Sequence, residues 1–94
     1  MNVLIHIPTA LRPYVGGRPA VEVAGSTAGE ALDDLTRLYP ELHKHLRGED
    51  GKLRSFVNIY LNDDDIRHLQ KEQTLLKAND SLIIVPSIAG GARG

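Results

Sequence analysis

The chain has 94 residues, and its 11 Lys+Arg against 12 Asp+Glu leave a net charge of −1. A chain of this length builds one hydrophobic core, and its balanced charge, without a run of Lys or Arg, argues against nucleic acid as the main partner. The absence of cysteine excludes disulfides, thiolate metal ligands and a thiol nucleophile.

Two short strands are predicted near the N-terminus. Residues 3–7 are rich in β-branched side chains, stop at Pro8 and place alternate apolar residues on one face. A loop punctuated by proline and glycine extends to Pro19, and residues 21–23 then alternate as a second strand. We expect the two strands to pair as a hairpin.

A helix is predicted to begin after Thr27. The Thr27 hydroxyl can accept a hydrogen bond from the N–H of Glu30, and the Glu30 carboxylate can reach back to the N–H of Thr27. The apolar residues Leu32, Leu35 and Leu38 recur at helical spacing. They predict one buried stripe on an otherwise polar helix.

A shorter second helix follows a break at Pro40, and Leu42 and Leu46 continue the apolar stripe through it. His43 and His45 lie in this segment. Because an i,i+2 pair on a helix points in different directions, we interpret them as solvated surface rather than as metal ligands.

The C-terminal half predicts two more strands. Residues 56–61 alternate apolar and polar side chains, which is typical of a half-buried strand, and residues 62–65 predict a polar turn. Ile66 and Leu69 are expected to anchor the next short stretch. Residues 82–85 are apolar without interruption, which predicts a strand that is either covered on both faces or placed centrally in the sheet. We expect it in the middle of the sheet, beside the first strand.

This element order predicts an α+β roll, in which four main strands form one sheet and one main helix packs across one face. We expect a single domain over residues 1–86 and a flexible tail over residues 87–94, where small residues show no periodicity. If extended, this tail would reach about 26–29 Å, enough to enter the active site of a partner. An ordinary frayed terminus is the alternative.

The whole chain resembles the ubiquitin-like sulfur-carrier family, which includes the small subunit of molybdopterin synthase and the sulfur carrier of thiamine biosynthesis. Three blocks carry this resemblance: residues 7–12 with Gly16-Gly17, residues 56–63, and an apolar strand followed by Pro86 and Gly90-Gly91. The likeness is greatest to carriers of thiocarboxylate-dependent cysteine biosynthesis. The resemblance implies a β-grasp (ubiquitin-like) roll with a mixed sheet of four to five strands.

The resemblance also implies a carrier that is not itself an enzyme and holds no cofactor. In such proteins an E1-like enzyme uses ATP to adenylate the terminal glycine, which corresponds to Gly91, and a sulfur nucleophile then converts it to a thiocarboxylate. Ser87, Ile88, Ala89 and Gly90 would thread into the partner's active site. The sulfur-accepting partner would be a synthase, with a pyridoxal-phosphate cysteine synthase as the leading hypothesis.

The chain departs from the family pattern at its end, where Ala92, Arg93 and Gly94 follow the second glycine. Gly91 cannot be adenylated while its carboxyl group is in a peptide bond. We expect these three residues to be removed, as in carriers that require a JAMM-type zinc metalloprotease. They could instead be a remnant of expression, or Gly94 could itself be the activated end.

A docking surface for partner enzymes is predicted on the exposed face of the sheet, with Tyr60 and with Leu11 or Tyr14 as candidates. Burial of these side chains is the alternative. We expect a monomer, because a monomer presents a free tail most easily.

Other functions remain open. The activated tail could form isopeptide bonds with lysines, for which Lys52, Lys71 and Lys77 are possible acceptors within the chain. Sulfur could also go to molybdopterin, thiamine, thiolated tRNA or a natural product. A non-covalent adaptor of the same fold would not need a free diglycine.

No segment approaches the ~20 apolar residues that span a bilayer, and no basic region precedes the first apolar run. We therefore expect a cytoplasmic protein without a membrane partner. The aspartates at 63–65 lack the glycine and the distant glutamate of a calcium loop, and no bound metal is expected.

Overall fold

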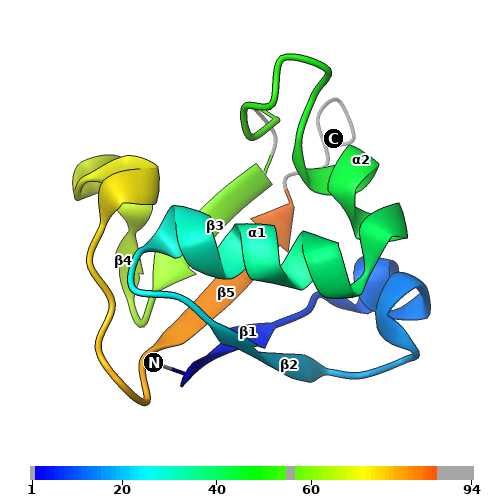
Figure 1. Ribbon diagram of the computed structural model, residues 1–94, viewed down its shortest axis with the longest axis horizontal. Helices are drawn as coiled ribbons and strands as arrows, with labels where there is room; N and C mark the ends of the chain where they lie inside the picture. The colour runs from blue at the N-terminus through cyan, green and yellow to red at the C-terminus, as the bar shows by residue number, and fades with distance from the viewer. Residues whose placement is uncertain (1, 55–56, 87–94) are drawn as a thin grey trace.

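The computed structural model describes residues 2–54 and 57–86. They form a five-stranded mixed sheet in the order β2-β1-β5-β3-β4, with helix α1 across one face (Figure 1). The strands are β1 (Asn2–His6), β2 (Ala20–Ala24), β3 (Val57–Leu61), β4 (Asp64–Asp65) and β5 (Ser81–Pro86). The helices are α1 (Ala28–Leu38) and α2 (His43–Leu46), joined by the 3-10 turn η2 (Pro40–Leu42). The expected β-grasp roll is confirmed.

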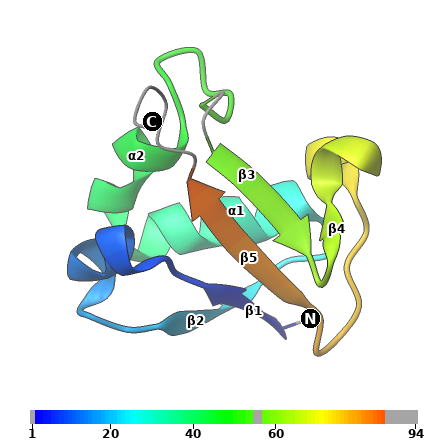
Figure 2. The same cartoon turned by 180° about the vertical axis from the view of Figure 1, so that it is seen from behind.

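The central position of β5 is also confirmed. It pairs parallel to β1, with Ile5 opposite Leu82, and antiparallel to β3, with Ile59 opposite Ile84. These side chains point toward α1 and are at most 2% exposed. Within the described residues, no helix covers the opposite face of the sheet (Figure 2). The uninterrupted apolar run of β5 therefore reflects its central position rather than cover on both faces, because Val85 on the second face is 39% exposed.

The predicted N-terminal cap of α1 is present. Thr27 Oγ1 accepts from the N–H of Glu30 at 3.1 Å. The Glu30 carboxylate, however, accepts mainly from Ser26, at 2.8 Å from its N–H and 2.7 Å from its hydroxyl. These bonds favour the charged form and lower the pKa of Glu30.

The buried stripe of α1 differs from the prediction at one position. Leu32 and Leu35 are fully buried, whereas Leu38 is 45% exposed. Successive three-residue steps fall short of a full helical turn, so Leu38 lies about 120° around the axis from Leu32. Ala28 and Ala31 complete the stripe instead. The break at Pro40 and the burial of Leu42 and Leu46 are as predicted.

The predicted loop after β1, the predicted polar turn after β3 and the short stretch that follows this turn all contain regular structure. Thr9–Val15 forms the 3-10 helix η1, which ends at Gly16 with φ 69°. The polar turn after β3 includes the short strand β4, which pairs with β3 through Tyr60 and Asp65. The 3-10 turns η3 (Ile66–His68) and η4 (Lys71–Gln73) follow. Ile66 is buried as expected, but Leu69 is 41% exposed and does not belong to the core.

Candidate functional site

The tail expected to carry the chemistry begins at the end of the central strand. Pro86, the last described residue, lies opposite Val57 at the start of β3. The predicted site residues Ser87, Ile88, Ala89, Gly90 and Gly91 and the extension Ala92, Arg93 and Gly94 lie outside the described residues. The described part of the site is thus the end of the sheet from which the tail continues.

Strand β5 runs through the middle of the sheet face that carries no helix (Figure 2). Register places Ile83 between His6 of β1 and Tyr60 of β3, and places Val85 opposite Asn58. Leu4, on the same face of β1, is 38% exposed, close to the 39% of Val85. We call Leu4, Tyr60, Ile83 and Val85 the outer-face patch. Half-exposed apolar side chains grouped on neighbouring strands are typical of a protein interaction site.

The three residues predicted for docking lie in different parts of the structure. Tyr60 lies on the outer face, as expected. Leu11 is only 8% exposed and belongs to the core, so its placement on the docking surface is wrong; η1 turns its side chain inward. Tyr14 is partly buried against the core, and its ring centroid lies 4.3 Å from that of His45. His45 is therefore a packed side chain rather than solvated surface.

An ion pair lies at the edge of the outer-face patch. Arg67 contacts Asp65 at 2.9 Å, and Asp65 Oδ1 also accepts from the N–H of Arg67 at 2.9 Å. The Arg67 side-chain hydrogen bonds, followed by the backbone bond, lower the pKa of Asp65. Because Asp65 pairs with Tyr60 in the register of β3 and β4, this salt bridge fixes the β4 edge beside Tyr60.

Within residues 2–54 and 57–86, no group of three or more His, Asp or Glu side chains could hold a metal ion. The same part of the chain contains no helix long and apolar enough to cross a membrane. The described part of the site therefore consists of the outer-face patch and the end of β5 that leads to the tail.

Sequence reasoning missed three members of the outer-face patch: Leu4, Ile83 and Val85. The alternation of β1 contained the signal for Leu4, because the apolar residues beside it, Val3 and Ile5, were predicted to share the other face of the strand. An uninterrupted apolar run does not reveal which of its faces is covered. Only the register with β1 and β3 places Ile83 and Val85 on the open side.

The first block of the resemblance has a structural explanation. Arg12 Nε donates to the carbonyl oxygen of Ile7 at 3.0 Å, and the N–H of Gly17 donates to the carbonyl oxygen of Arg12 at 2.7 Å. Gly16 and Gly17 both hold positive φ, which favours glycine. These residues fix η1 against the sheet and contribute no reactive group.

The chain matches the ThiS family over residues 5–91. It is 42% identical over 93 residues to the sulfur carrier protein CysO of Mycobacterium tuberculosis, covering 97% of this chain and 100% of that protein. A chain in the crystal structure of the Amycolatopsis orientalis BexX/CysO complex has a TM-score of 0.86 and 38% identity, covering 95% of this chain and 99% of that one. Small archaeal modifier protein 1 of Methanosarcina acetivorans has a TM-score of 0.87 and 30% identity, with 96% of both chains covered.

Proposed function

The chain belongs to the ThiS family, and we propose from this membership that it is a sulfur carrier whose working group is the carboxyl of Gly91. The observation that carries the proposal is the extent of the family match, which includes the diglycine and ends at residue 91. The similarity to CysO over nearly the whole chain favours cysteine biosynthesis as the pathway.

The proposed chemistry takes place on partner enzymes. A carboxylate oxygen of Gly91 attacks the α-phosphorus of ATP on an E1-like adenylating enzyme, and pyrophosphate leaves. A sulfide equivalent then attacks the carbonyl carbon and expels AMP, so that a thiocarboxylate remains. Adenylation is needed because a free carboxylate lacks a good leaving group. This route also explains how a chain without cysteine can transfer sulfur.

The fold supports delivery of the tail into a partner. Five residues separate Pro86 from the end of Gly91, a reach of about 17 Å if they are extended. The partner can therefore hold its active site roughly this far from the docked body. We propose that the outer-face patch provides the docking contact, because Val85 immediately precedes Pro86 and is 39% exposed.

Release of the working terminus requires cleavage. We propose that a JAMM-type zinc metalloprotease hydrolyses the peptide bond between Gly91 and Ala92. Water supplies the hydroxyl group that completes the Gly91 carboxyl, and the extension leaves with a free amine. The step consumes no ATP, and its product is the substrate of the adenylating enzyme.

The sulfur acceptor is proposed to be a pyridoxal-phosphate cysteine synthase that uses O-phosphoserine. The likeness to small archaeal modifier protein 1 favours a second candidate function, in which the activated Gly91 forms an isopeptide bond with a lysine amine. Both functions need the same free carboxyl, and they differ only in the attacking nucleophile.

The test is intact-mass analysis of the chain incubated with its adenylating enzyme, ATP and sulfide. The chain ending at Gly91 should exchange one oxygen for sulfur, and the chain ending at Gly94 should remain unmodified until the protease is added. Thiocarboxylate formation on Gly94 itself would contradict the cleavage step. If neither the chain ending at Gly91 nor the chain ending at Gly94 gained sulfur, and if the Gly91→Trp variant still bound the partner fully, a non-covalent adaptor would be favoured. Isopeptide remnants on lysines of other proteins would support the modifier function.

A further inference from the structure

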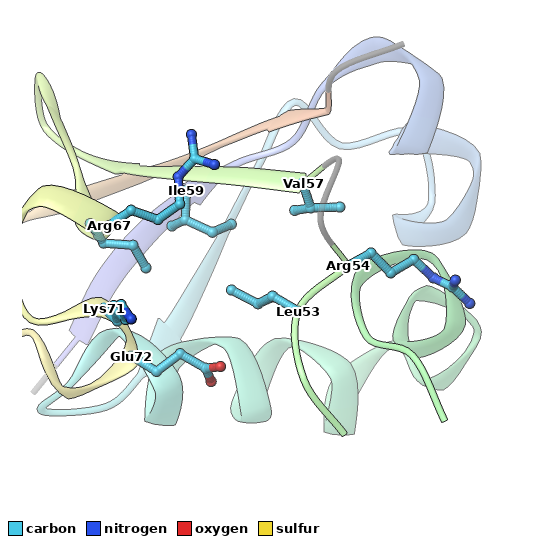
Figure 3. A pocket seen from close by; sticks show the side chains of 8 residues that line it. Leu53, Arg54, Val57, Ile59, Arg67, Lys71 and Glu72 are labelled. Carbon is cyan, nitrogen blue, oxygen red and sulfur yellow. The ribbon is translucent and has the colours of Figure 1, made fainter. Parts of the chain in front are cut away.

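A cleft of about 300 Å³ lies on the helix side of the sheet, away from the outer-face patch (Figure 3). Val57 and Ile59 of β3 form one wall, and Leu53 projects toward them from the segment before the strand. Ile66 completes the apolar lining. Lys71 and Glu72 of η4 stand on the opposite wall (Figure 3), so the cleft is apolar inside and charged at its rim.

The wall opposite β3 is held by a buried arginine. Arg47, whose side chain is 8% exposed, contacts Glu72 at 2.6 Å and Asp33 of α1 at 3.3 Å. It also donates to the carbonyl oxygen of Gly51 at 2.8 Å. Because one guanidinium joins α1, η4 and the segment before β3, the cleft is preformed and need not be opened by a ligand.

Three cationic side chains and one acid line the cleft: Arg54, Arg67, Lys71 and Glu72. The Arg54 guanidinium points away from the cleft (Figure 3), and its Nε donates to the carbonyl oxygen of Lys44 at 2.7 Å. Arg47 already neutralises Glu72, and Asp65 neutralises Arg67. In the part of the chain that the structure describes, no carboxylate lies within ion-pair distance of the Lys71 ammonium. A ligand with an apolar group and a neighbouring negative charge would therefore complement the cleft.

We propose that this cleft receives one apolar side chain of a protein partner, flanked by an Asp or Glu that pairs with Lys71. A volume of about 300 Å³ is at the lower limit of small-molecule sites and suits a single anchor side chain. The cleft also reaches the root of the tail, because Val57 both lines it and pairs with Pro86. A partner that accepts the tail must approach this end of the sheet, so a protein is favoured over a free metabolite.

The inference rests on the proposed function and adds a second contact to it. The outer-face patch and the cleft lie on opposite sides of β3. One partner can therefore contact both faces of this strand next to Pro86, where the tail begins. The cleft would then select partners by one apolar anchor and one carboxylate.

The test uses three capped pentapeptides: Glu-Asp-Phe-Glu-Asp, the same sequence with Ala in place of Phe, and Lys-Lys-Phe-Lys-Lys. Each is titrated into the isotope-labelled chain and followed by NMR. The first peptide should shift signals of Leu53, Val57, Ile59 and Ile66, and the other two should not. Lys71→Glu should weaken binding of the first peptide about fivefold or more, because an attraction becomes a repulsion.

Lys77→Glu is the matched control, since it makes the same charge change outside the cleft, and it should leave the affinity within about twofold. Equal binding of all three peptides, equal effects of the two variants, or shifts confined to the exposed residues Leu69 and Leu75 would overturn the proposal. The titration requires no Gly91 chemistry. A failed thiocarboxylate assay with a positive titration would therefore reject the carrier function and keep the cleft, and the reverse result would do the opposite.

Discussion

The two faces of the sheet use neighbouring residues of the same strands in different ways. Ile5 and Leu82 point toward α1 and are 0% exposed, whereas Leu4 and Val85 on the other face are 38% and 39% exposed. All four are aliphatic, so residue type does not distinguish them. The position of α1 does, because it removes one face from water and leaves the other open.

This difference implies that the stability of the fold and the binding of a partner can be altered by separate substitutions. Burial of an aliphatic side chain stabilises the fold by roughly 25 cal/mol per Å² of apolar surface. A half-exposed side chain still has apolar surface that a bound partner can remove from water. Substitutions on the inner face should therefore alter stability, and substitutions on the outer face should alter binding.

The largest expected effect is on the inner face. Ile5→Ala should lower the free energy of unfolding by about 3 kcal/mol, because it removes buried methyl groups and leaves a cavity under α1. Chemical denaturation of the two proteins measures this difference. Such a loss is a large fraction of the ~5–15 kcal/mol that holds a typical domain together.

Leu4→Ala is the control for that prediction, since it removes the same kind of side chain from the next residue on the other face. It should cost less than about 1 kcal/mol. If the two variants lost equal stability, the distinction between a structural and a docking face would be wrong.

The sequence predicted most of the inner face and little of the outer one. The helix cap at Thr27 and the alternation in β1 and β3 are local signals, so their elements were found. The burial of Leu11 and the exposure of Val85 depend on tertiary contacts. Neither residue carries a local signal of its environment, because an isolated apolar side chain fits both a core and an interface.

The chemical part of the site depended on resemblance rather than on physics. A pair of glycines near the end of a chain has no chemistry of its own, and Gly91 was identified only because it matches the working terminus of a family. The contacts of Arg47 with Asp33 and Glu72, and the cleft beside them, could not be inferred, because these three residues are far apart in sequence and meet only after folding.

A second prediction concerns the outer face alone. Val85→Asp should weaken binding to the adenylating enzyme about tenfold or more, equivalent to about 1.4 kcal/mol, because it places a charge within an apolar contact. Its effect on stability should stay below about 1 kcal/mol. Isothermal titration gives the dissociation constant, and denaturation gives the stability.

Ala78→Asp provides the matched control for added negative charge, because Ala78 is exposed and lies outside both the outer-face patch and the lining of the cleft. It should leave the dissociation constant nearly unchanged. Equal weakening by both substitutions would show that net charge, rather than the patch, governs docking.

The smallest expected effect concerns the edge of the sheet, where strand β2 is attached to α1. Asp34 of α1 accepts from the N–H of Ala24 in the edge strand β2 at 2.9 Å and also pairs with Arg37. The bond from Ala24, followed by that from Arg37, lowers the pKa of Asp34 below its ordinary value of 3.8. The charged carboxylate therefore holds the end of β2 against the helix.

Asp34→Asn should reduce stability by less than about 1 kcal/mol at neutral pH, because a neutral amide accepts a weaker hydrogen bond than a carboxylate does. A depressed pKa in the folded state contributes stability above the unfolded value of 3.8 and loses it as the pH falls through the folded value. The difference between the two proteins should thus shrink as the solution is acidified below about pH 4, since protonation removes from the native chain the charge that the variant lacks. Denaturation curves over a pH series measure this difference. A gap that stays constant or widens in acid would mean that Asp34 holds β2 by its shape rather than by its charge.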